Sequence, residues 1–85
     1  MTIPAALKVL NTYSAELRAV GHANLLAEIR DLHRTPSQEG IDRLTRLLDG
    51  HSLDRMREPG LASAVLAVCA QVIAEARTAL LFAAL

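Results

Sequence analysis

The three histidines and the acidic side chains are the residues of this chain that could bind a metal ion or transfer a proton. The histidines are His22, His33 and His51. No two of them are four residues apart, so they cannot form a pair of metal ligands on one helix face. The chain also lacks a Glu-x-x-His motif, the signature of a carboxylate di-metal bundle. We therefore expect surface or helix-end histidines, with no metal and no other cofactor.

Cys69 and Glu75 are the residues near the C-terminus that could act as a nucleophile or as a general acid. Cys69 stands among apolar residues, where a thiol is more often inert packing than a reactive group. We expect Glu75 to point out of the protein, although a role for it as a desolvated acid stays open. The phosphate-binding loop, the dinucleotide fingerprint and the nucleophile elbow are all absent. The sequence thus predicts a protein that is not an enzyme.

The charges are unlike those of most nucleic-acid-binding proteins. Nine basic and nine acidic residues give a net charge of zero, and the chain has only one tyrosine and one phenylalanine. A helix-turn-helix can nevertheless be constructed over residues 43–57, with Arg43, Arg46, Arg55 and Arg57 available to DNA. Its second helix would be little more than one turn long, so a small DNA-binding regulator is kept only as an alternative and nucleic acid is not the expected partner.

Helix-forming residues dominate the chain. Alanine and leucine together account for 30 of the 85 residues, whereas valine and isoleucine account for only nine. No stretch alternates apolar and polar residues with the period of two that indicates a strand. The predicted fold class is therefore all-α. We expect one domain over residues 1–85, a small antiparallel bundle of four main helices plus a short helical turn.

The first two helices are predicted from apolar residues at intervals of three and four. Pro4 suits the first turn of a helix, and Gly21 suits a left-handed cap at its end. The apolar stripe between them consists of Leu7, Leu10, Tyr13, Leu17 and Val20. A second stripe consists of Leu25, Leu26, Ile29 and Leu32. One continuous helix over residues 4–34 is the alternative.

The third helix is predicted to begin in the sequence Thr35-Pro36-Ser37-Gln38. Thr35 would be the N-cap and Gln38 would complete a capping box. Asp49 and the glycine after it would end this helix. A short turn capped by Ser52 would then precede the last helix.

The last 25 residues, 61–85, are more apolar than the rest, because 20 are apolar and only Glu75 and Arg77 are charged. Such a helix is surrounded by other helices or by a membrane. The uncharged stretch from Leu61 to Ala74 has only 14 residues, whereas a span takes about 20. Each charge costs roughly 2.5–3.5 kcal/mol in a bilayer. We expect a central bundle helix in a cytoplasmic protein, with a membrane-associated small protein as a further alternative.

The same helix could also bind a partner. Its small residues recur four apart, which lets another helix approach closely, and a chain of 85 residues has few helices to cover it. Exposed apolar surface beyond a few hundred Å² usually marks an interface. We therefore predict a small non-catalytic protein–protein interaction module, an adaptor or a homo-oligomer, whose partner is a second copy in a homodimer or another protein. The predicted interface residues are Leu61, Val65, Val68, Val72, Ala79, Leu81, Phe82 and Leu85.

Overall fold

The computed structural model describes residues 2–49 and 59–85. These residues form five α-helices and no strand, which confirms the predicted all-α fold class. The helices are α1 (Ile3–Asn11), α2 (Ser14–Ala19), α3 (Leu25–Arg34), α4 (Gln38–Asp49) and α5 (Pro59–Ala83). The helical turn predicted after Ser52 lies outside the described residues.

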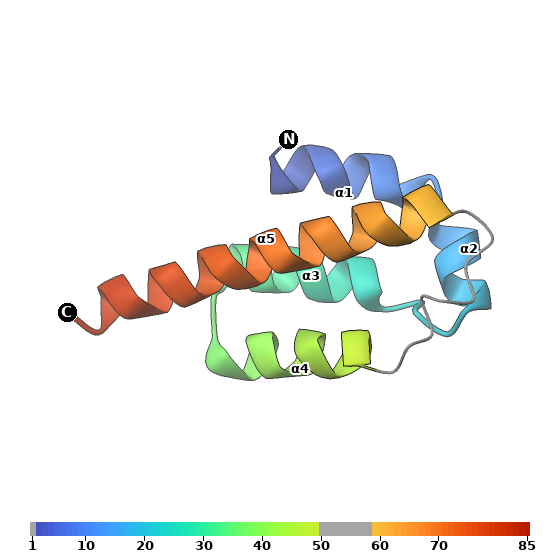
Figure 1. The fold of residues 1–85 in the computed structure, drawn as a ribbon. Coiled ribbons are helices and arrows are strands. Elements are labelled where there is room, and N and C mark those ends of the chain that lie inside the picture. The colour runs from blue at the N-terminus through green and yellow to red at the C-terminus, as the bar shows by residue number, and fades with distance from the viewer. Residues whose placement is uncertain (1, 50–58) are drawn as a thin grey trace.

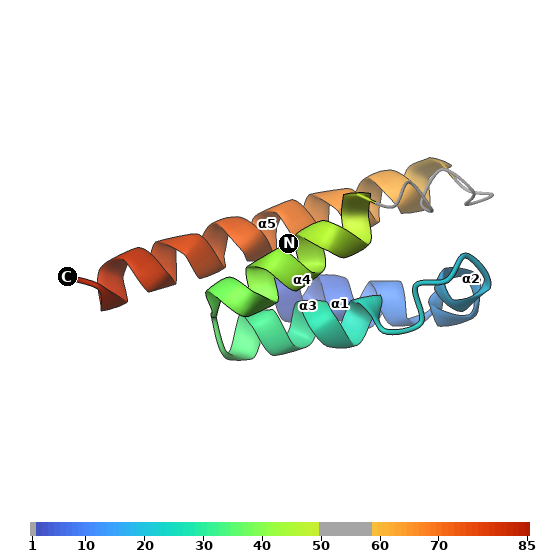
Figure 2. The ribbon, with the colours of Figure 1, turned by 90° about the horizontal axis from the view of Figure 1, so that it is seen from below.

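Helices α3 and α5 share the centre of the molecule. Each of them packs against α1 and α4, and they also pack against each other. In Figure 1, α1 and α4 run from left to right, whereas α3 and α5 run from right to left. With 25 residues, α5 is about 37 Å long at 1.5 Å per residue. The other helices have 12 residues or fewer, so the C-terminal end of α5 projects beyond them (Figures 1 and 2).

The first predicted helix is two helices, which corrects the sequence analysis. The amide N–H of Ala5 donates to the Thr2 hydroxyl at 3.4 Å, so Thr2 caps α1. The regular hydrogen bonding stops at Thr12, whose hydroxyl donates to the Val9 carbonyl at 2.7 Å. Tyr13, placed by the sequence in the apolar stripe, is exposed instead. Residues 11–14 are Asn-Thr-Tyr-Ser, all of low helix propensity, which explains the break.

Gly21 ends α2 in the left-handed conformation, as predicted. Its φ is +88°, and its N–H donates to the Arg18 carbonyl at 3.1 Å. The N–H of His22 donates to the Leu17 carbonyl at 2.8 Å. Together these bonds make a Schellman motif, which satisfies carbonyl groups that the end of a helix leaves unpaired. The chain then enters α3, so residues 4–34 are not one continuous helix.

Gly21→Ala is expected to lower the free energy of unfolding by about 1–2 kcal/mol, because a Cβ atom disfavours a positive φ. No atom lies within 4 Å of the position that this Cβ would take, so the cost is conformational and not steric. Gly60 is the matched control, since it is helical and has equally free surroundings. Gly60→Ala should be neutral or stabilise by up to about 1 kcal/mol. Urea denaturation measures both changes, and equal effects would contradict the account of Gly21.

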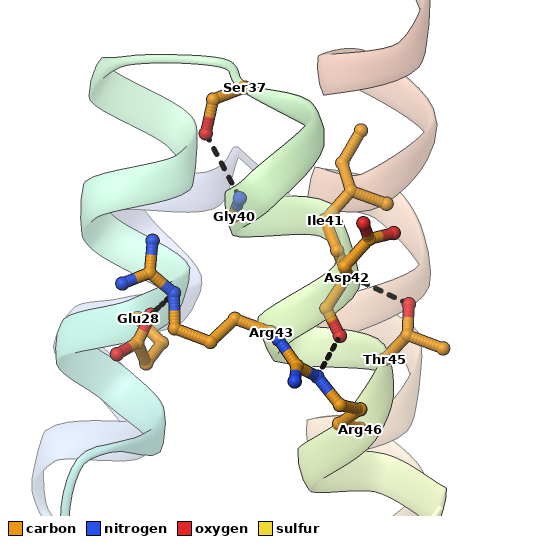
Figure 3. Close-up of polar contacts among 8 residues, drawn as sticks. All are labelled: Glu28, Ser37, Gly40, Ile41, Asp42, Arg43, Thr45 and Arg46. Carbon is orange, nitrogen blue, oxygen red and sulfur yellow. Dashed lines mark hydrogen bonds and ion pairs between the residues drawn. The ribbon is translucent and has the colours of Figure 1, made fainter.

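The N-cap of α4 lies two residues later in the chain than predicted. Ser37, and not Thr35, is the N-cap of α4, because its hydroxyl accepts from the Gly40 N–H at 3.0 Å (Figure 3). The Ser37 carbonyl accepts from the Ile41 N–H at 3.1 Å. A Cβ atom at Gly40 would lie 2.9 Å from Leu32 Cδ1. Gly40 therefore permits the close approach of α3 and α4.

Candidate functional site

The predicted interface residues of α5 fall into two groups. Four of the eight are buried in the core of the chain itself: Leu61, Val65, Val68 and Val72. They recur at intervals of three and four along one side of α5, the side that packs on α1, α3 and α4. This corrects the sequence analysis, because the helices of the same chain already cover these four side chains.

The other four predicted residues, Ala79, Leu81, Phe82 and Leu85, are exposed. Leu81 is 64% exposed, Phe82 is 67% exposed and Leu85 is 93% exposed. They belong to the projecting end of α5, and we refer to residues 79–85 as the apolar tip. Every residue of the tip is apolar, and no residue after Ala76 is buried.

The apolar tip belongs to the α5 helix as far as Ala83, and backbone hydrogen bonds continue through its last two residues. The N–H of Ala84 donates to the Leu80 carbonyl at 3.1 Å, and the N–H of Leu85 donates to the Phe82 carbonyl at 3.2 Å. A helical tip holds its large side chains at fixed angles around the axis. It therefore offers a shaped surface to a partner.

The side of α5 that faces away from the core carries mainly small side chains. We refer to Ser63, Ala67, Ala70 and Ala74 as the outward face; all four are exposed. At 100° per residue they lie opposite the buried side, and Leu81 and Leu85 continue the same line into the apolar tip. These four residues carry no charge, whereas the exposed residues Arg77 and Thr78 border the same side of the helix between Ala74 and Leu81.

One exposed side chain of α5 was missed by the sequence analysis. Leu66 is 45% exposed and lies beside the outward face. The interval from Leu66 to the neighbouring apolar residues does not differ from the intervals between buried residues. In a helix that is apolar nearly all round, the sequence therefore gives no signal that separates exposed apolar residues from buried ones.

An open groove of about 490 Å³ lies at the base of the apolar tip. The end of α3 and Pro36 form one wall, and α5 from Val72 to Phe82 forms the other. His33 Nδ1 lies 3.9 Å from Glu75 Oε2 across this groove. The Glu75 side chain is 52% exposed, so it points out of the bundle as predicted.

The side chains considered for chemistry are dispersed over the structure. His22 lies at the C-terminal end of α2, one of the two expected locations, but its side chain is buried, whereas His33 is exposed and His51 lies outside the described residues. In the part of the chain that the structure describes, no three histidine, cysteine, aspartate or glutamate side chains are grouped to hold a metal ion. Cys69 is completely buried in α5, and this burial raises the pKa of its thiol to about 12.

The raised pKa of Cys69 predicts a loss of stability at alkaline pH. Above pH 9, the ordinary pKa of the thiol, the unfolded chain loses the proton while the folded chain keeps it. The folded state then binds more protons, so its stability falls as pH rises, by about 1.4 kcal/mol between pH 8 and pH 10. Urea denaturation of the wild type and of Cys69→Ala at each pH gives the difference between their free energies of unfolding. This difference should shrink by about 1.4 kcal/mol between pH 8 and pH 10. A difference that is independent of pH would contradict the prediction.

Two of the arginines in the helix-turn-helix alternative contact their own chain (Figure 3). Arg43 Nε lies 3.5 Å from Glu28 Oε2, and this ion pair joins α4 to α3. Arg46 Nε donates to the Asp42 carbonyl at 3.4 Å. Arg55 and Arg57 lie outside the described residues. The described residues therefore add no observation in favour of DNA binding.

The segment Gly60–Ala83 is long and apolar enough to cross a membrane, by length and composition only. Central helices of soluble proteins meet the same criterion. Here 28% of the most apolar part of the segment is buried against other helices. No protein-family model, curated protein or solved structure significantly matches this chain. Any function must therefore be argued from the surface of the molecule itself.

Proposed function

We propose that this protein is a small non-catalytic interaction module that pairs with a second copy of itself through the apolar tip and the outward face of α5. The observation that carries the proposal is the exposure of Leu81, Phe82 and Leu85 at the end of a projecting helix. Three large apolar side chains side by side in water are typical of a protein–protein contact. An adaptor that offers the same surface to a different protein is the variant of this proposal.

The apolar tip alone supports only weak pairing. Burial of a large apolar side chain contributes about 1.5–3 kcal/mol relative to full exposure. Two copies bring six such side chains, each about two thirds exposed or more, so the gross gain is about 6–12 kcal/mol. The lost freedom of two associating molecules costs about 4–15 kcal/mol. A stable homodimer therefore needs contact beyond the tip.

The outward face of α5 supplies the additional surface. Its serine and alanines leave the backbone accessible, so a second helix can approach closely along residues 63–74 of α5, with Arg77 at the border between this stretch and the apolar tip. Stable complexes bury about 800 Å² on each partner. A pair of α5 helices in contact from the outward face to the tip comes nearer to this size than contact at the tip alone.

The experiment that tests this proposal is a series of amide nuclear magnetic resonance spectra at increasing protein concentration. We expect the resonances of residues 63–85 on the exposed side of α5 to shift as the protein associates. Resonances of Ala5 and Val9, which are exposed on α1, should stay unchanged. Shifts confined to α1 or α4 would place the contact elsewhere and contradict the proposal.

Membrane association is the second candidate function, because Gly60–Ala83 is long and apolar enough to cross a bilayer. Insertion would expose the buried side of α5 and would bring Glu75 and Arg77 into the hydrocarbon core, at roughly 2.5–3.5 kcal/mol for each charge. We therefore predict that the protein stays in the supernatant when it is mixed with lipid vesicles and centrifuged. Recovery with the vesicles after a carbonate wash would favour the membrane instead.

A further inference from the structure

The charges of α3 are divided between its two sides. Arg30, His33 and Arg34 border a groove between α1 and α3, together with Lys8 of α1. The acidic residues of the same helix, Glu28 and Asp31, line a separate hollow toward α4, and Arg34 borders both hollows. A chain with a net charge of zero thus presents a concentrated basic surface among its described residues.

The groove between α1 and α3 has an apolar floor and a basic rim. Its volume is about 670 Å³. Apolar lining comes from Pro4, Leu7, Leu26 and Ala27, and none of the nine lining residues is acidic. The partly buried side chains of Leu7 and Leu26 pack against the core, so the floor is part of the folded scaffold. No residue of α5 lines this groove, which is therefore distinct from the proposed interface.

The basic rim keeps most of its charge available to a ligand. Lys8 and Arg34 form no ion pair with any described residue. Arg30 Nε lies 3.8 Å from Asp31 Oδ1 and His33 Nδ1 lies 3.9 Å from Glu75 Oε2, but all four side chains are 40% exposed or more, and such pairs contribute little. The complementary ligand is therefore an anion with an apolar surface.

We propose that this groove is a docking site for an acidic amphipathic helix of a partner protein. The lining residues of α3 extend from Leu26 to Arg34, so the groove is about 12 Å long at a rise of 1.5 Å per residue. This length matches about two turns of a helix, with apolar residues at i, i+3, i+4 and i+7 facing the floor. Aspartate or glutamate residues that flank this stripe would lie beside the basic rim.

The open shape of the groove favours a helix over a lipid chain. An alkyl chain in an open groove leaves its outer side in water and loses much of the free energy of burial. An amphipathic helix places its apolar stripe on the floor and keeps its polar side in water. The nearly apolar floor also distinguishes this site from a simple phosphate-binding surface, which needs converging donors.

A designed peptide is the probe for this site. It has about 15 residues, near the minimum for a helix in water, with leucine at i, i+3, i+4 and i+7 and glutamate at the flanking positions. The matched peptide has lysine in place of each glutamate. We expect fluorescence anisotropy to show binding of the glutamate peptide, at least about tenfold tighter than the lysine peptide and weaker as salt rises.

Variants of the full chain locate the binding. The double variant Lys8→Glu, Arg34→Glu should bind the glutamate peptide at least about tenfold more weakly than the wild type does. Arg18→Glu, at an exposed site on α2 outside the groove, is the matched control and should leave binding unchanged. Far-UV circular dichroism verifies that each variant stays folded. Leu81→Asp should also retain peptide binding, so failure of the α5 interface and failure of this site are distinguishable.

Three results would overturn this proposal: equal binding of the two peptides, unchanged binding by the double variant, or no binding at millimolar peptide. Vesicles of phosphatidylglycerol are the lipid arm of the experiment. Binding to these vesicles without binding to the glutamate peptide would assign the groove to an anionic lipid surface instead.

Discussion

Leu81→Asp is expected to convert the self-associated protein into a monomer that keeps its helical signal. Leu81 is 64% exposed in the single chain, so the new carboxylate is hydrated in the monomer and the fold is retained. In the pair, the carboxylate would lose its water without gaining a partner, at a cost of several kcal/mol. Light scattering and far-UV circular dichroism on one sample measure mass and helix content together.

Val9→Asp is the matched control for this result. Val9 is 50% exposed on α1. Its substitution therefore also replaces an exposed apolar side chain by aspartate, but at a site outside the α5 surface. Its mass should equal that of the wild type. If Val9→Asp dissociates the protein and Leu81→Asp does not, the interface lies on α1 and the present assignment is wrong.

Val65→Asp is expected to unfold the protein. Val65 has 0% exposure, and a carboxylate in its place would lie in the core among apolar side chains. An unpaired buried charge costs several kcal/mol. This cost approaches the whole free energy of unfolding of a domain of 85 residues, about 4–13 kcal/mol. Far-UV circular dichroism should show that most of the helical signal is lost.

Ala64→Asp, one residue away on the same helix, is the control for Val65→Asp. Ala64 is exposed, so its aspartate stays hydrated and the fold should be retained. A Val65→Asp variant that remains folded would mean that α5 leaves the core at small cost. In that case the buried residues of α5 would return to the set of possible interface residues.

The sequence predicted the elements that depend on local signals. Gly21 was identified as a left-handed cap, and the apolar spacing of α3 placed Leu25, Ile29 and Leu32 in the core. The break at Thr12 also had a local signal, in four successive residues of low helix propensity, but the apolar stripe outweighed it. A regular stripe can continue across a break between two helices.

The remaining features depend on contacts between helices. Thr35 and Ser37 are both good N-caps, and Ser37 is used where Gly40 can approach Leu32 closely. The orientation of α5 was also beyond the sequence, because apolar residues surround nearly the whole helix and its periodicity does not mark one side. The eight predicted interface residues therefore included both core and surface positions. The groove between α1 and α3 arises from residues that are up to 30 positions apart in the chain.

The mass of the wild-type protein in solution, measured by sedimentation equilibrium over a range of concentrations, tests the central proposal most directly. The chain has a mass of 9.2 kDa. We predict that the average mass rises toward twice this value, with a midpoint below about 100 µM, as expected for an interface of moderate free energy. Leu81→Asp should remain at 9.2 kDa throughout. A wild-type mass of 9.2 kDa at all concentrations up to about 1 mM would contradict self-association through α5.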